Sequence, residues 1–168
     1  MKPTVVLLHG LGRTHLSLTG LRRHLERAGF PTWACSYPSR RAPIATLAAE
    51  VAARIQTEVT AEALVAVTHS MGGILVRHLR DTFPWRGLVM LAPPNQGSRV
   101  AVAMRERAVF RLLCGPAGLE LCTASAWPAP PLPFAVIAGT RPGRLNPSAW
   151  FKSARIFTPG EPNDGTLA

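Results

Sequence analysis

The sequence predicts an α/β domain with a mostly parallel central sheet and helices on both faces. Continuous apolar runs are typical of parallel strands that are buried on both faces. Here such runs alternate with segments of helical spacing, a pattern that favours right-handed crossovers in one sheet. Five runs read as strands: TVVLL (4–8), TWACSY (32–37), LVAVT (64–68), GLVML (87–91) and FAVIA (134–138).

The segments between these runs predict four helices. Thr14 is placed to cap a helix that runs to about Ala28, with Gly29 as its stop. Pro43 opens a second helix, to about residue 60, with apolar residues at four-residue spacing. Further helices are expected over 71–80 and from 98 to about 113. The proline-rich stretch 122–133 reads as an ordered loop with Trp127 as a lid.

Size and charge restrict the class of protein. The 168 residues fit one domain, 1–168, that is large enough to bury a core. The net charge of +10 can attract nucleic acid or an anionic membrane. The arginines are scattered and not interleaved with aromatic residues, which favours a solvated surface and no nucleic-acid partner. No run of about 18 apolar residues occurs, so no membrane span is expected.

The cysteines bear on location and cofactors. The chain has three, Cys35, Cys114 and Cys122. An odd number without a signal-peptide pattern predicts reduced thiols and a cytoplasmic location. Pairing of Cys114 with Cys122 stays open at this stage. No Cys/His spacing suits zinc, and we expect neither a metal nor another cofactor.

The stretch VTHSMGG (67–73) carries the candidate nucleophile, Ser70. A serine between a buried strand and a helix fits a nucleophile elbow, a sharp turn that needs small neighbours. Gly72 and Gly73 are small, whereas Thr68 stands where a glycine is usual. The alternative is that Ser70 only caps the helix.

The stretch HGLG (9–12) follows the first strand and supplies a candidate oxyanion hole. In serine hydrolases the N–H after the nucleophile, here that of Met71, binds the oxyanion. A second donor comes from the loop after an earlier strand, which predicts the Leu11 N–H. By itself, HGLG is also compatible with an ordinary glycine turn.

Five stretches together resemble the α/β-hydrolase family, in particular small bacterial lipases and esterases. They are VVLLHGLGRT, VTHSMGGILVRHL, VMLAPPNQGS, FAVIAGT and PNDGT, and the resemblance runs from residue 4 to about 166. It implies that Ser70 attacks the carbonyl of an uncharged carboxylic ester and forms an acyl-enzyme. It also implies that Asp164 is the catalytic acid, since the family's chain order is Ser, Asp, His. The other aspartate, Asp81, is expected at the surface.

The histidine that serves as general base in the family has no counterpart here, because none of the five histidines follows Asp164. His9 is expected to serve the turn, His69 to leave it on the far side, and His78 to lie two helical turns from Ser70. His15 is the only candidate for a substitute base near the mouth. We therefore expect a chain without the family's C-terminal strand and histidine, and a strand 134–138 whose open edge invites self-association.

Three alternatives remain at the level of function. One is a catalytically impaired or inactive hydrolase-fold binding protein, and another is an acyltransferase that uses an alcohol or thiol acceptor. The third is a structural protein that dimerises through its edge strand.

Overall fold

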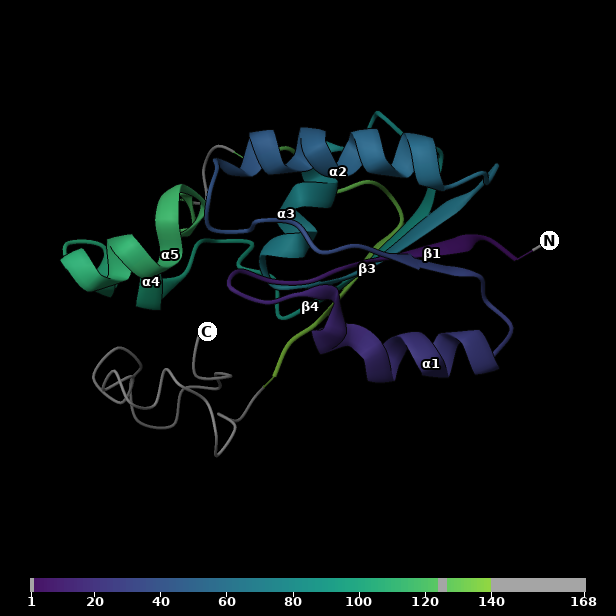
Figure 1. Ribbon diagram of the computed structural model, residues 1–168, viewed down its shortest axis with the longest axis horizontal. Coiled ribbons are helices and arrows are strands. Elements are labelled where there is room, and N and C mark those ends of the chain that lie inside the picture. Colours follow the sequence, from purple (N-terminus) through teal and green to yellow (C-terminus); the bar gives the residue numbers. More distant parts are fainter. Residues whose placement is uncertain (1, 124–126, 140–168) are drawn as a thin grey trace.

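The computed structural model describes residues 2–123 and 127–139, and these contain one parallel sheet (Figure 1). Its five strands lie in the order β2-β1-β3-β4-β5, and every neighbouring pair is parallel. The predicted α/β class is therefore confirmed. The strands are β1 (Thr4–Leu8), β2 (Thr32–Ala34), β3 (Leu64–His69), β4 (Trp85–Leu91) and β5 (Phe134–Ile137).

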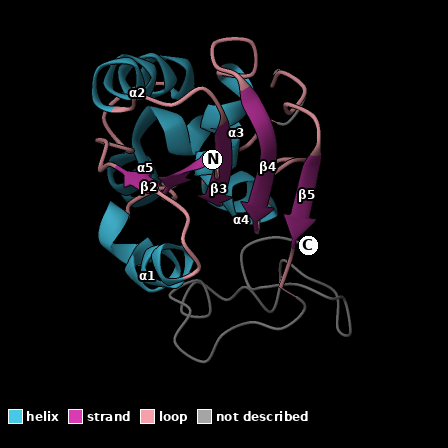
Figure 2. Ribbon diagram, turned by 90° about the vertical axis from the view of Figure 1, so that its right-hand side faces the viewer, coloured by secondary structure: helices cyan, strands magenta, loops and turns pink. Residues whose placement is uncertain are grey.

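Helices cover both faces of the sheet, as Figures 1 and 2 show. α1 lies on one face and α2 and α3 lie on the other, while α4 and α5 lie beyond the carboxyl ends of the strands. The helical elements are η1 (His15–Leu18, a 3-10 helix), α1 (Thr19–Arg27), α2 (Ile44–Glu58), α3 (Met71–His78), α4 (Arg99–Met104) and α5 (Ala108–Glu120).

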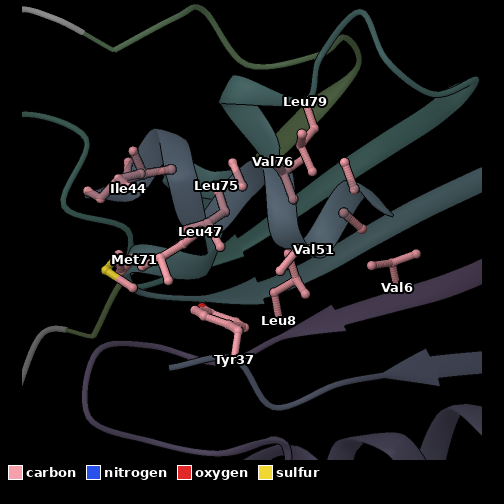
Figure 3. Packing of buried hydrophobic residues seen from close by; sticks show 14 of the residues in the cluster. Val6, Leu8, Tyr37, Ile44, Leu47, Val51, Met71, Leu75, Val76 and Leu79 are labelled. Atoms are coloured by element: carbon pink, nitrogen blue, oxygen red, sulfur yellow. The ribbon is translucent and has the colours of Figure 1, made fainter. Parts of the chain in front are cut away.

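The alternation of side chains along β1 divides the core in two. Val6 and Leu8 belong to the large apolar cluster under α2 and α3 (Figure 3), whereas Val5 and Leu7 pack in a smaller cluster with Leu18. Successive residues of a strand point to opposite faces. A central strand with a helix on each face must therefore be apolar throughout, which explains the uninterrupted TVVLL run.

Three predicted boundaries were wrong. The first helix begins as a 3-10 turn, and the Thr14 side chain makes no capping hydrogen bond. β2 ends at Ala34, before the predicted Tyr37, because Tyr37 is buried against the first loop of the sheet instead of continuing the ladder. The helix predicted over 98–113 is two helices, since α4 ends at Met104 and α5 begins at Ala108.

α5 is fixed to the loop and helix that follow β2. A kink at Gly115, where φ is 63°, places its Cα against the backbone of Arg40, whose carbonyl oxygen would lie 1.8 Å from a Cβ on Gly115. The Glu120 carboxylate accepts a hydrogen bond of 2.9 Å from the backbone N–H of Ile44, the first residue of α2. A carboxylate satisfies such an unpaired N–H and favours the positive end of the helix dipole.

β5 forms an edge of the sheet within the described residues. It pairs with β4 on one side, and Phe134, Val136 and Ile137 are 45%, 44% and 59% exposed. In the described ranges, no helix is both long and apolar enough to cross a bilayer.

Candidate active site

Three of the predicted site residues, Leu11, Ser70 and Met71, lie on segments that leave the sheet where the strand order reverses. β1 is followed in the chain by β2 on one side, while β3 pairs with β1 on the other side. In parallel sheets this reversal opens a crevice at the carboxyl ends of the two strands. Leu8 and Thr68 are partners in the β1–β3 register, so the loop after β1 and the turn after β3 leave the sheet side by side.

Ser70 occupies this turn in a strained backbone conformation. Its φ is 52° and its ψ is −125°, a region that residues with a Cβ rarely adopt. The Ser70 N–H donates a hydrogen bond of 2.8 Å to the carbonyl of Leu91 in β4, and this bond ties the turn to the sheet. The Ser70 side chain makes no capping hydrogen bond to α3, so the helix-cap interpretation is wrong.

The turn is held by close backbone contacts that only glycine permits. A Cβ on Gly72 would lie 2.6 Å from the carbonyl oxygen of Leu8 and 2.9 Å from that of His9. A Cβ on Gly10 would lie 3.0 Å from the Cβ of Ser70. The first turn of α3 and the loop after β1 are therefore in direct backbone contact beside the serine.

Thr68 fits in the position where a smaller residue was expected. Its side chain is fully buried, and its hydroxyl donates a hydrogen bond of 3.4 Å to the carbonyl of Val89. A Cβ on Gly73 would lie 3.2 Å from this hydroxyl oxygen and 3.0 Å from the sulfur of Met90. Because Gly73 has no side chain, the Thr68 side chain fits beside α3 although a glycine is usual at this position.

The two predicted oxyanion donors are Met71, which follows the serine in the chain, and Leu11, which follows Gly10 in the loop after β1. Met71 is the first residue of α3, so the helix offers no acceptor for its N–H. Leu11 lies in the adjacent loop, and its side chain packs against α5, where a Cβ on Gly118 would be 3.3 Å from it. Within the described residues the Leu11 N–H has no acceptor, whereas the Gly12 N–H donates to the Ser39 hydroxyl at 2.9 Å.

His9 is a structural residue, as predicted. It is fully buried and stacks on Tyr37, with 4.0 Å between the ring centroids. Its Nε2 accepts the Tyr37 N–H at 3.3 Å, which leaves Nδ1 to donate to the Gly10 carbonyl at 2.9 Å. Burial lowers the pKa of His9, so the ring is neutral at pH 7. Both nitrogens are engaged, and neither is available to Ser70.

The other candidate histidines have separate surroundings. His15 contacts Ser36, with 2.7 Å between its Nδ1 and the serine hydroxyl. His69 was expected on the far side of the turn, but its Nδ1 would lie 2.9 Å from a Cβ on Gly10, in the loop after β1. This proximity arises because the loop after β1 places Gly10 next to the end of β3. The sequence alone does not predict that arrangement. Within the described ranges no histidine is hydrogen-bonded to Ser70.

The predicted acid, Asp164, lies outside the described residues. Asp81 is at the surface as expected, where it pairs with Arg80 at 3.2 Å. The three cysteines are free thiols. In the part of the chain that the structure describes, no three His, Cys, Asp or Glu side chains are grouped so that they could hold a metal ion.

Trp127, the residue predicted as a lid, has contacts with the core and with α3. It packs against the apolar core, and its backbone carbonyl and that of Pro128 accept hydrogen bonds from Arg77. Arg77 lies seven residues after Ser70, so two turns of α3, or about 10 Å, separate them along the helix. The same guanidinium donates to the Asn95 side chain at 3.1 Å, and it thereby links α3 to the loop after β4.

Sequence reasoning missed the contribution of the turn after β2. Tyr37 and Ser39 are buried against the loop that carries Leu11. The sequence of this turn carries no recognisable motif that signals these contacts.

Comparison with known proteins supports the fold assignment. The family model described as "Alpha/beta hydrolase family" matches residues 5–167. The mature lipase BlEst2 from Bacillus licheniformis superimposes with a TM-score of 0.74 at 19% identity, over 99% of this chain and 77% of that one. Phospholipase PlaB from Legionella pneumophila gives 0.59 at 20% identity, over 73% of this chain.

A third similar structure is an extracellular alpha/beta-hydrolase from a Paenibacillus species, with a TM-score of 0.53 at 17% identity over 65% of this chain. The aligned part spans 33% of the Legionella phospholipase and 51% of the Paenibacillus hydrolase. At these identities the likeness shows the fold. No match was found among curated protein sequences.

Proposed function

The chain belongs to the alpha/beta hydrolase family, and on this premise we propose that it is a serine carboxylic ester hydrolase of the esterase or lipase type. Ser70 attacks the ester carbonyl, forms an acyl-enzyme and releases the alcohol. Water then hydrolyses the acyl-enzyme. The observation that carries the proposal is the strained backbone of Ser70 at the strand-to-helix turn, because backbone strain of this kind clusters at active sites.

The oxyanion that forms in each step is bound by the N–H groups of Leu11 and Met71. Two backbone donors without other acceptors are suited to a developing negative charge, because they need no reorganisation when it appears. The positive end of the α3 dipole lies at the same point and adds to this stabilisation. Uncharged carboxylic esters fit such a site, and no cofactor is required for this chemistry.

The acid and base complete the proposal. By chain order Asp164 is the acid that orients the base. The sequence holds five histidines, all before Asp164, and His15 is the candidate for a substitute base. Its contact with Ser36 would have to be exchanged for one with Ser70. A cytoplasmic location stays a prediction, which rests on the odd number of cysteines.

A second candidate function is a hydrolase-fold binding protein without catalysis. The observation that favours it is that, in the described part of the chain, no histidine is hydrogen-bonded to Ser70. Removal of the base costs a serine hydrolase several orders of magnitude in rate but leaves the pocket intact. An acyltransferase differs from the esterase only in the acceptor of the acyl group, which is an alcohol or thiol in place of water.

Hydrolysis of p-nitrophenyl butyrate by the 168-residue chain and its Ser70→Ala variant separates these functions. The proposal predicts turnover that falls roughly a thousand-fold or more in Ser70→Ala. Equal background rates in both proteins would favour the binding protein. Product analysis with added alcohols or thiols identifies an acyltransferase, since it would yield a new ester or thioester in place of the free acid.

A further inference from the structure

The turn after β2 holds the loop that carries Leu11 through contacts from two buried side chains. The Tyr37 hydroxyl donates a hydrogen bond to the backbone carbonyl of His9. The Tyr37 ring stacks on the His9 imidazole with an interplanar angle of 10°. Tyr37 is 7% exposed, so this hydrogen bond is shielded from water. The start of the loop is thereby fixed on its carbonyl and on its side chain.

The His9 ring passes this constraint to the next residue. The Tyr37 N–H donates to His9 Nε2, and His9 Nδ1 in turn donates to the carbonyl of Gly10. A neutral imidazole has one donor and one acceptor nitrogen, so the two bonds require one tautomer and one ring orientation. Gly10 is the residue whose Cα faces the Cβ of Ser70.

Ser39 fixes the far end of the loop and determines which N–H groups remain open. Ser39 is 4% exposed, and its hydroxyl accepts the Gly12 N–H at 2.9 Å. The Arg13 N–H donates to the Gly10 carbonyl at 3.2 Å. The Leu11 N–H precedes these two satisfied groups in the chain and has no acceptor within the described residues. Ser39 therefore occupies the Gly12 N–H, while the Leu11 N–H in the same loop stays without an acceptor.

We propose that Ser39 and Tyr37 are positioning residues that hold the His9–Gly12 loop so that the Leu11 N–H serves as the oxyanion donor. This inference rests on the proposed function of Ser70. Neither side chain touches the reacting atoms, and both act through the backbone of the loop. The turn after β2, which carries no recognisable motif, thus determines the geometry of the oxyanion hole.

The first test measures the loop without catalysis. In the ¹⁵N-labelled full chain, amide hydrogen exchange of Gly12 is compared between wild type, Ser39→Ala and Ser39→Thr. Loss of the acceptor in Ser39→Ala should speed exchange of the Gly12 amide by about fivefold or more, whereas Ser39→Thr keeps the hydroxyl and the protection. Unchanged exchange of Gly12 in Ser39→Ala would overturn the proposal.

The second test measures the oxyanion hole with phenylboronic acid, which adds to a serine hydroxyl and gives a tetrahedral boron with a negative charge. Affinity is measured by calorimetry, and the tetrahedral species is identified by its ¹¹B chemical shift. Ser39→Ala should weaken binding by about five- to tenfold, and Ser39→Thr should restore it. Tyr37→Phe keeps the stacked ring and should weaken binding by a smaller factor.

Two controls separate this inference from the proposed function. Ser17→Ala removes an exposed hydroxyl away from the loop and should bind phenylboronic acid like wild type. Ser70→Ala should abolish binding, and if it does not, the proposed function fails while Gly12 exchange still decides on the loop. Wild-type affinity in Ser39→Ala, with the tetrahedral boron on Ser70, would contradict the positioning role.

Discussion

The carbonyl oxygen of Leu8 lies where a side chain on Gly72 would begin. A Cβ built on Gly72 would be 2.6 Å from that oxygen, a distance that real Cβ atoms essentially never show. The obstructing atoms belong to the backbone of β1 and cannot rotate away. We expect Gly72→Ala to lower the free energy of unfolding by about 2–3 kcal/mol and to displace the turn that carries Ser70.

Urea denaturation checks this prediction, with Gly20→Ala as a matched control. Gly20 also lies in a helix, but a Cβ there would have no heavy atom within 4 Å. The control should be neutral or stabilise by up to about 1 kcal/mol. A similar change in unfolding free energy for the two variants would show that the close contact with Leu8 has no energetic consequence.

The strained backbone that presents the Ser70 side chain should lower the free energy of unfolding. With φ at 52° it holds a conformation that glycine adopts without strain. We predict that Ser70→Gly is more stable than Ser70→Ala by about 1 kcal/mol, because only glycine relieves the strain. Both variants lack the hydroxyl and should be equally inactive. If their melting temperatures coincide, the turn is not strained.

The strand pattern and the two glycine motifs were enough to predict the sheet, its parallel class and the place of Ser70. Each of these patterns predicts the structure of its own segment, since an apolar run indicates a buried strand and a glycine motif indicates a turn. The position of His69 and the role of Ser39 could not be predicted, because both depend on how loops far apart in sequence meet. The sequence pattern also did not predict the break of the 98–113 helix between Met104 and Ala108, nor the kink at Gly115, which fits α5 against Arg40.

The buried His9 should make stability depend on pH. Burial lowers the pKa of His9 from its ordinary value of 6.5, and burial does the same for His78. The unfolded chain therefore binds protons at a higher pH than the folded chain. The contribution of these two histidines to the free energy of unfolding is fully present above about pH 6.5. It decreases as the pH falls toward the folded-state pKa, by at most about 1.4 kcal/mol per pH unit for each histidine.

Denaturation of the His78→Gln variant at pH 7.5 and pH 5.5 removes the contribution of His78 and tests the part of the pH dependence that includes His9. We expect a lower free energy of unfolding at pH 5.5. The same value at both pH values would mean that His9 takes up its proton as readily in the folded protein as in the unfolded chain.

The exposed side chains of β5 should promote self-association. Val136 is 44% exposed on a strand whose outer edge is unpaired within the described residues. A charged side chain on an edge strand opposes pairing with a second edge. Val136→Lys should lower the apparent mass in light scattering at high protein concentration. The exposed Gln96→Lys adds the same charge elsewhere and should not; a monomeric wild type would contradict the prediction.

Covalent labelling of Ser70 tests the central claim most directly. A fluorophosphonate reacts with an activated serine and places its phosphoryl oxygen in the oxyanion hole. The account predicts one adduct per chain by intact mass, located at Ser70 by peptide mapping and absent from Ser70→Ala. A folded wild-type chain that stays unlabelled, or an adduct on another residue, would contradict it.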